Sequence, residues 1–429
     1  MADIAAKTTS IPPEIDEGSL SRSSQALIPG SAVQPGLEMV VEIDPAGTLD
    51  PALGVRSRIP ETGRIVVNVA EMPPFSLTVI PFVWSETSDS SVVASALGME
   101  ADPTGHALLE HTTGLLPIGH LDVTAHAPVV TSSNNVSTLL DQTVAIRTIE
   151  GGSGNWIGLI APPVEGGVTG VATLGGGSES ASITSSSTIA HELGHNMGLF
   201  HAPCGGASWV DTAFPHANGS IGAWGYDFRR QVLVAPDTPD LMSYCRPRWI
   251  SDYHFGNALR YRLAEQANTG ASRSAAIRSL LLWGGVGEDG IPYLEPAFVM
   301  DAPPTLPRSG GVYRLAGRDA SGSELFSIQF EMQEVADANG KKLFAFTVPV
   351  ETDWSVDLAD ITLAGPEGSA SLDRDTDRPM TILRSLSNGQ VRGILRNVSP
   401  AAGVQADAGG SGLDLLFSRG MPDVASWRR

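Results

Sequence analysis

The sequence predicts an α/β (α+β) domain with a mixed, mostly parallel sheet, followed by a C-terminal antiparallel β-sandwich. Two observations support this fold class. From about residue 75 to about residue 268, apolar strand-like runs alternate with helical patterns, which is typical of a layered α/β domain. Beyond about residue 274, alternating apolar residues flank Asn-Gly pairs, which is the pattern of antiparallel hairpins.

The composition favours folded domains over disorder. The chain has 429 residues, enough for two or three domains, and it is 42% hydrophobic and 17% charged. We expect a flexible N-terminal segment at 1–36, a small β-rich appendage or pro-segment at 37–74, the α/β domain at 75–273 and the sandwich at 274–429.

The charge excludes some classes of partner. A net charge of −20 argues against nucleic acid and against an anionic membrane surface. No apolar run reaches the roughly 18 residues that a membrane span needs. The N-terminus lacks the apolar core of a secretory signal, so either the protein stays in the cytoplasm or the chain begins after a removed signal. We assume a monomer.

The elements of the α/β domain each have a signal. Phe75–Trp84 is a continuous apolar, β-branched run, typical of a buried central strand. Asp102 suits a helix N-cap, Pro103 the first helical position and Gly114 the position after the helix. Further strands are expected at 119–130, 155–163 and 167–177, and further helices at 134–151, from about Ser187 to Gly198, and at 250–268.

The C-terminal part carries hairpin signals. Asn339-Gly340 lies between Phe326–Met332 and Phe344–Val348, two runs in which apolar side chains alternate. A second pair, Asn388-Gly389, separates two further apolar runs. Because Asn-Gly adopts the positive φ angles of a tight hairpin turn, both places predict hairpins, and together they indicate the sandwich.

Three of the nine histidines lie in the segment HELGHNMGLFH. His191 and His195 are four residues apart, so on a helix both imidazoles share one face and can reach one ion. Glu192 points to a different side, where it can act as a general base without binding the ion. Gly198 can end the helix with a positive φ and return His201 as a third ligand. Three protein nitrogens leave a fourth position for water, as in a catalytic zinc site.

The same segment matches the full H-E-x-x-H-x-x-G-x-x-H signature, and it resembles the metzincin zinc endopeptidases. A degenerate enzyme that only retains the metal is the structural alternative. Metzincins carry a methionine turn beneath the metal, and Met242 in DLMSYC is the candidate. Tyr244 resembles the tyrosine that assists the oxyanion in astacins and serralysins, although it could instead be a packing aromatic. Ala202 after the third histidine matches no better-known subfamily, so the resemblance points to a less-studied bacterial branch with features like those of astacins, serralysins and reprolysins.

The resemblance implies a zinc-dependent endopeptidase over about residues 75–268. One catalytic Zn²⁺ would activate a water, with Glu192 as general base and Tyr244 as hydrogen-bond donor to the oxyanion. The family's substrate lies antiparallel along an edge strand, so the expected partner is a protein or peptide. The residues that resemble this strand are Gly167, Val168, Thr169, Gly170, Val171 and Ala172.

The resemblance also bears on the two cysteines. Cys204 lies three residues after His201 and Cys245 three residues after Met242, so both should lie near the metal. We expect a disulfide between them, with free buried thiols or a cysteine metal ligand as the alternatives. Because disulfides persist in oxidising compartments, a bridge favours a secreted or extracellular protein.

Two further interpretations stay open. Asp373–Asp377 resembles the start of a calcium loop, but Arg378 and Arg384 stand where such a loop has glycine and glutamate, so a solvated turn is preferred to Ca²⁺. The alternative function is a catalytically weak, zinc-retaining binding or adhesion protein that uses the C-terminal sandwich. An intact Glu192 and Tyr244 favour the enzyme, because a pure binding protein needs neither.

Overall fold

The computed structural model divides the chain into two compact units. One comprises Met1–Pro73 with Tyr226–Ala235, and the other comprises Pro74–Gly225 with Pro236–Arg429. The expected boundary at 273–274 lies outside the described residues, as does part of the segment 1–36. The structure describes residues 3–6, 16–23, 25–265, 275–307, 310–350, 354, 358–398, 412–422 and 426–427.

The first unit is built from short β-ladders. β1 (Glu38–Met39) pairs antiparallel with β4 (Ile65–Val66), and β2 (Val41–Glu42) pairs antiparallel with β3 (Arg58–Ile59). β11 (Gly225–Asp227) pairs with β12 (Val232–Val234). Two single turns of 3₁₀-helix, η1 (Gly30–Ala32) and η2 (Pro51–Leu53), accompany them. Strands of two or three residues bury little, so this unit presents few apolar side chains to a core.

The second unit contains the mixed sheet that the sequence predicts. β5 (Phe75–Trp84) lies at its centre and pairs in parallel with its three partners. Only the last strand, β9, is antiparallel to its neighbour β10. The mixed α/β class is therefore confirmed. The other strands of this part are β6 (Leu121–Ala125), β7 (Val129–Thr131), β8 (Asn155–Ile160), β9 (Gly170–Thr173) and β10 (Glu179–Ile183).

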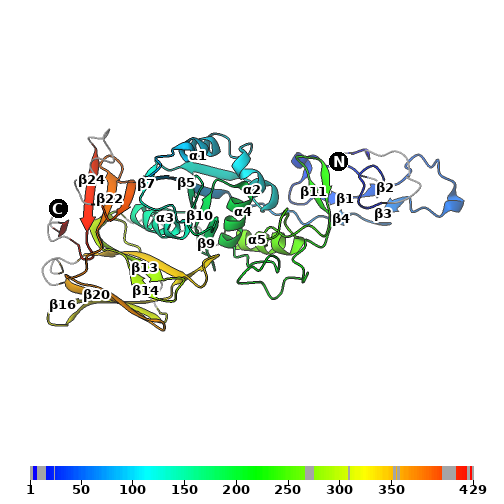
Figure 1. Ribbon diagram of the computed structural model, residues 1–429. Helices are drawn as coiled ribbons and strands as arrows, with labels where there is room; N and C mark the ends of the chain where they lie inside the picture. Colours follow the sequence, from blue (N-terminus) through cyan, green and yellow to red (C-terminus); the bar gives the residue numbers. More distant parts are fainter. Residues whose placement is uncertain are drawn as a thin grey trace. The chain divides into compact units, whose positions relative to one another are not determined.

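Both faces of this sheet are covered, which explains the continuous apolar run of β5. Leu77 and Val79 point into one core, while Ile80 and Phe82 point into another. Successive strand residues alternate between faces, so a strand buried on both sides is apolar throughout. The first core contains α1 (Ser91–Ala101) and α4 (Ser186–Asn196), and the second contains α3 (Val136–Glu150) (Figure 1).

Capping residues explain the ends of α3, but the helix expected to begin at Asp102 differs from the prediction. Asn135 caps α3 by accepting a hydrogen bond from the Thr138 N–H, and Gly151 follows its last turn. Asp102, expected to begin a helix, instead follows α1, whose Val92, Ala96 and Met99 are buried. The expected helix is reduced to η3 (Ala107–Leu109) and α2 (Glu110–Leu115). Asp102 accepts a hydrogen bond from the Gly105 N–H, so its side chain closes a turn between helices.

The strands of the C-terminal part lie in two sheets that share a core. One is the 14-stranded sheet that also contains β5, in which β13 (Ile277–Val286) pairs with β14, β15 and β19; the other has four strands in the order β17-β16-β20-β21. Leu280 and Leu282 of β13 pack in one cluster with Leu315 and Ile361 of the four-stranded sheet. The strands are β14 (Pro292–Leu294), β15 (Phe298–Ala302), β16 (Tyr313–Asp319), β17 (Glu324–Phe330), β18 (Gln333–Ala336), β19 (Lys342–Pro349), β20 (Leu358–Gly365), β21 (Gly368–Leu372), β22 (Met380–Ser385), β23 (Val391–Arg396) and β24 (Leu413–Ser418).

Strands from the C-terminal part also extend the α/β sheet. β23 pairs in parallel with β7, and β18 pairs antiparallel with β9. The hairpin expected at Asn339-Gly340 forms, but its first strand is β18 rather than the run Phe326–Met332. Most of that run belongs to β17, which pairs with β16 in the other sheet. Alternation of apolar side chains does not identify the partner strand of β19, because several strands here bury one face. Met380–Ser385 and Val391–Arg396 pair around Asn388-Gly389 as expected.

One further helix precedes the C-terminal strands. α5 (Asp252–Glu265) begins where Ser251 Oγ accepts a hydrogen bond from the His254 N–H. Among the described residues, no helix is both long enough and apolar enough to cross a membrane.

Candidate metal centre

Two of the clustered histidines lie on α4. His191 and His195 are buried, with 3% and 0% of their surface exposed. The helix stops at Asn196, and Gly198 takes a φ of 79°. The Leu199 N–H then bonds back to the Gly194 carbonyl at 3.1 Å, which closes the helix end and redirects the chain. His201 arrives from this turn, so it faces the two helical histidines.

The three imidazoles meet at their Nε2 atoms. Nε2 of His191 lies 3.2 Å from that of His195 and 3.3 Å from that of His201. The third separation, between His195 and His201, is 3.1 Å. A tetrahedral ion with bonds of about 2.0–2.1 Å separates its ligand atoms by about 3.3–3.4 Å. The spacing of the nitrogens therefore fits a single ion between them.

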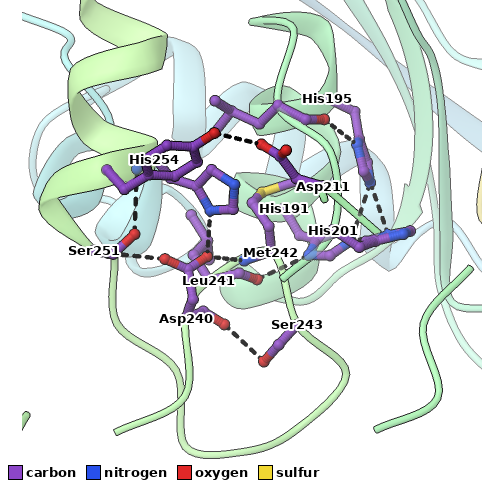
Figure 2. Close-up of polar contacts among 12 residues, drawn as sticks. His191, His195, His201, Asp211, Asp240, Leu241, Met242, Ser243, Ser251 and His254 are labelled. Carbon is purple, nitrogen blue, oxygen red and sulfur yellow. Dashed lines mark hydrogen bonds and ion pairs between the residues drawn. The ribbon is translucent and has the colours of Figure 1, made fainter. Parts of the chain in front are cut away.

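The other ring nitrogens fix the orientation of the histidines. Nδ1 of His191 faces the Leu241 carbonyl at 2.9 Å, and Nδ1 of His195 faces the Leu199 carbonyl at 2.8 Å. Nδ1 of His201 faces the Ser208 carbonyl. A carbonyl oxygen only accepts, so each Nδ1 carries the hydrogen and each Nε2 presents a lone pair. Figure 2 shows the three rings converging.

Three converging lone pairs could bind one cation. Burial lowers the pKa of His195 to about 4, so its imidazole is neutral at pH 7, as a metal ligand must be. With the hydrogen of each ring on Nδ1, the three imidazoles cannot hydrogen-bond to one another through their Nε2 atoms. A metal ion satisfies all three at once.

The sequence did not indicate the fourth member of this group, Asp337. It directly follows β18, and its side chain is 9% exposed. Asp337 Oδ2 lies 3.4 Å from Nε2 of His191 and 3.3 Å from Nε2 of His195. Oδ1 lies 3.2 Å from Nε2 of His201 and accepts a hydrogen bond from the Tyr244 hydroxyl. The three histidines and Asp337 together could hold a metal ion.

The Asp337 carboxylate supports the same conclusion. Its Oδ2 is buried and has no hydrogen-bond donor among the described residues. An anionic oxygen that faces two imidazole lone pairs is unfavourable unless a cation lies between them. No other group of three or more potential ligands is found within the described ranges, and the turn at Asp373–Asp377 is closed by hydrogen bonds to Asp373 from Asp375 and Thr376.

Glu192 lies beside the histidines and is 2% exposed. A Cβ added at Gly170 of β9 would lie 2.1 Å from its Oε1, so only glycine leaves room for this carboxylate. Its Oε2 has no hydrogen-bond partner among the described residues. Burial raises the pKa of Glu192 well above its usual value, the negative charge of Asp337 raises it further, and Arg248 opposes the rise. The group is therefore suited to accepting and holding a proton.

Met242 lies beneath α4 and is fully buried. A Cβ at Gly194 would lie 2.6 Å from its sulfur, so the helix and the turn are in close contact. Asp240 holds this turn: its carboxylate accepts hydrogen bonds from the Met242 N–H, the Ser251 N–H and His254 Nδ1 (Figure 2). The turn in turn supplies the Leu241 carbonyl that orients His191. The hydrogen bonds of Asp240 and of the Leu241 carbonyl therefore fix the position of His191.

The loop that carries His201 is tied to the same turn. The Ala202 N–H bonds to the Met242 carbonyl at 3.0 Å, and the Tyr244 N–H bonds to the Cys204 carbonyl at 3.1 Å. Cys204 and Cys245 form a disulfide with their Cα atoms 5.7 Å apart. The predicted bridge is thus present, and the described residues contain no free cysteine.

Removing this bridge is expected to destabilise the fold. The cysteines are 41 residues apart, and closing a loop of that length contributes about 4 kcal/mol in the chain-entropy model. We expect the double variant Cys204→Ser/Cys245→Ser to lose about this much free energy of unfolding, measured by urea denaturation. Thr212→Ser, at an exposed position within the loop that the bridge closes, is the control. Two alkylatable thiols in the unreduced native protein would contradict the bridge.

Half of the expected substrate strand lies in β9. Gly170, Val171 and Ala172 belong to β9, while Gly167, Val168 and Thr169 precede it. β9 pairs with β10 on one side. On the other side it pairs with β18, so its outer edge is not open.

A buried centre of three histidines beside a carboxylate is the kind of site that metallopeptidases use. Residues 135–274 match the family described as Peptidase M66. The match supports a metallopeptidase family and a protease activity, with proteins or peptides as substrates. It includes the three histidines, Glu192, Met242 and Tyr244, whereas Asp337 lies beyond it. No curated protein matches the chain.

Proposed function

We propose that the chain is a zinc-dependent endopeptidase of the metzincin type. The observation that carries this proposal is the convergence of three Nε2 lone pairs, with Glu192 buried beside them. Three imidazoles suit zinc, and a carboxylate that binds no metal suits a general base. The match to Peptidase M66 supports the same reaction class.

Zinc held by His191, His195 and His201 would supply Lewis acidity, which polarises a scissile carbonyl and lowers the pKa of water. Glu192 accepts the proton of the attacking water and passes it to the leaving amine. Its buried environment favours the protonated form, so the proton can be held between the two steps. Burial and then Asp337 raise the pKa of Tyr244, so its hydroxyl stays protonated and can donate to an oxyanion.

β9 is the proposed binding strand for the substrate. A peptide added antiparallel along its outer edge would gain backbone hydrogen bonds that do not depend on sequence. Gly170 begins this strand and is also the residue that leaves room for Glu192. The same glycine therefore brings the peptide backbone close to the base.

Replacing Gly170 with alanine is expected to reduce peptide cleavage. The new methyl would meet Glu192 Oε1 at 2.1 Å and the Thr188 methyl at 2.6 Å, so the carboxylate must move. A displacement of about 1 Å at a reacting group can cost roughly 10²-fold in rate. Metal content, measured by atomic absorption, should not change. Gly114→Ala is the matched control, because nothing lies within 4 Å of its added methyl. Where Gly114→Ala cleaves peptides, an equal rate in Gly170→Ala would contradict this placement.

A second candidate function has one specific observation in its favour. With Asp337 the centre has four protein ligands, and closed sites of four ligands are typical of structural zinc. The chain would then be a zinc-retaining binding or adhesion protein that uses a C-terminal β-sandwich at 274–429. We also infer export from the cell for either function, since the disulfide would persist in an oxidising compartment.

One experiment separates the two functions. The native chain and Asp337→Ala, each metal-free and zinc-loaded, are incubated with a peptide library derived from a proteome, and new termini are read by mass spectrometry. Zinc-dependent cleavage by either protein supports the peptidase. If neither protein cleaves any peptide when loaded with zinc, the peptidase proposal is wrong and the binding function is favoured.

A further inference from the structure

The strand on the outer edge of β9 comes from the chain itself. In the antiparallel pairing with β18, Val335 faces Thr173 and Ala336 faces Ala172. The Leu174 N–H also bonds to the Glu334 carbonyl at 2.8 Å. This is the edge, and the antiparallel direction, that the proposed function assigns to a peptide substrate. A substrate and β18 cannot occupy it together.

The residue after this pairing reaches the metal centre. Asp337 follows Ala336 directly, and its carboxylate faces all three imidazoles at 3.2–3.4 Å. These separations are close to those among the imidazole nitrogens themselves, so the carboxylate stands at the fourth corner of the site. Asp337 also accepts the hydrogen bond of the Tyr244 hydroxyl, which the proposed mechanism needs for the oxyanion.

The chain then turns away from the histidines. Asp337 has a φ of 62°, and Asn339 and Gly340 follow with φ of 41° and 82°. The turn leads the chain back into β19 and does not continue it past the histidines. No extended backbone among the described residues therefore follows Asp337 past the histidines, and the segment is presented as a ligand rather than as a cleavable peptide.

Contacts on both sides of Asp337 hold the segment in place. Val335 and Ala338 are fully buried in the core that contains α3. Lys341 forms a buried ion pair with Asp141 of α3 at 2.7 Å and donates to the Ser137 carbonyl at 2.9 Å. The segment is thus part of the folded structure.

We propose that residues 333–337 are an internal inhibitory segment: β18 occupies the substrate strand's edge of β9, and Asp337 is the fourth ligand of the metal. The structure then describes a latent form of the proposed peptidase, and the inference rests on that function. Activity requires Asp337 to leave the metal, which frees the fourth position and the Tyr244 hydroxyl, and it requires β18 to leave the edge of β9. Displacement or cleavage of the β18–β19 hairpin would achieve this.

The test uses the full chain loaded with Co²⁺, whose visible absorption reports the ligands of the metal. Asp337→Ala and the near-isosteric Asp337→Asn are each expected to change the cobalt spectrum. If the hairpin is displaced in about one native molecule in ten or fewer, the apparent affinity for a peptide hydroxamate should rise about tenfold or more in Asp337→Ala, measured by calorimetry. Peptide cleavage should rise by a similar factor.

Asp319→Ala is the matched control, because Asp319 also lies in a hairpin turn and accepts hydrogen bonds from Ser321 and Ser323 there. It should leave the spectrum, the affinity and the cleavage rate unchanged. Asp337→Asn keeps the side chain's shape, so it serves if the alanine variant does not fold.

The outcomes separate this inference from the proposed function. A native cobalt spectrum and native hydroxamate affinity in both Asp337 variants would overturn the inference, even if the native chain cleaves peptides. A changed spectrum and tighter hydroxamate binding without any cleavage would support Asp337 as the ligand and reject the peptidase.

Discussion

Replacing Glu192 with glutamine is expected to remove most proteolytic activity while leaving the metal centre intact. Glutamine keeps the size of the side chain, so it fits against Gly170 as glutamate does. It cannot accept a proton from water, and general acid–base catalysis by one positioned group contributes roughly 10²–10⁴-fold in rate. We expect kcat to fall by a factor in that range, whereas KM should change little.

The measurement is best made with Asp337→Ala as the background, since the native chain is expected to be latent. Zinc content is determined in parallel, because Glu192 is not among the four potential ligands and its replacement should not release the metal. Glu86→Gln, an exposed glutamate in the same unit, is the control. Undiminished cleavage by Glu192→Gln would mean that another group accepts the proton.

The histidines of this centre could be predicted from the sequence, because their positions depend on residues close to them in the chain. His191 and His195 share a helix face by their spacing alone, and Gly198 can end the helix without outside help. Cys204 and Cys245 could be paired because each lies three residues from a residue that should approach the metal. The apolar run of β5 and the cap at Asn135 are local signals of the same kind.

Asp337 could not be predicted in this way. It lies 93 residues from Tyr244, whose hydroxyl it binds, and nothing in its neighbourhood marks it as a ligand. The only signal was the Asn339-Gly340 turn, which locates a hairpin but not the sheet that the hairpin joins. The expected domain boundary lies near residue 274, whereas β18 pairs with β9 across that boundary. Pairing between distant strands depends on the whole fold, so a periodic pattern in one strand cannot reveal it.

Removing the Asp240 carboxylate is expected to cost both stability and metal affinity. The side chain is fully buried and accepts three hydrogen bonds, from His254 Nδ1 at 2.8 Å and from the Met242 and Ser251 N–H groups at 2.7 and 2.8 Å. Asp240→Ala leaves these three donors without an acceptor. A buried donor left without an acceptor typically costs about 1–3 kcal/mol, so we expect the loss of three hydrogen bonds to lower the free energy of unfolding by at least about 3 kcal/mol.

The same substitution should also lower the affinity for the metal. Leu241 is the next residue after Asp240, and its carbonyl orients His191. Loss of the turn would therefore free the His191 imidazole to rotate. Outer partners of metal ligands are typically worth about 10–100-fold in affinity, and a comparable loss is expected in a zinc competition titration. Asp211→Ala is the matched control: Asp211 accepts a hydrogen bond from the Tyr253 hydroxyl of α5 at 2.8 Å but does not adjoin Leu241 (Figure 2). If both variants lose stability but only Asp240→Ala loses zinc, the methionine turn positions His191; equal zinc affinity in the two would show that the turn only stabilises the fold.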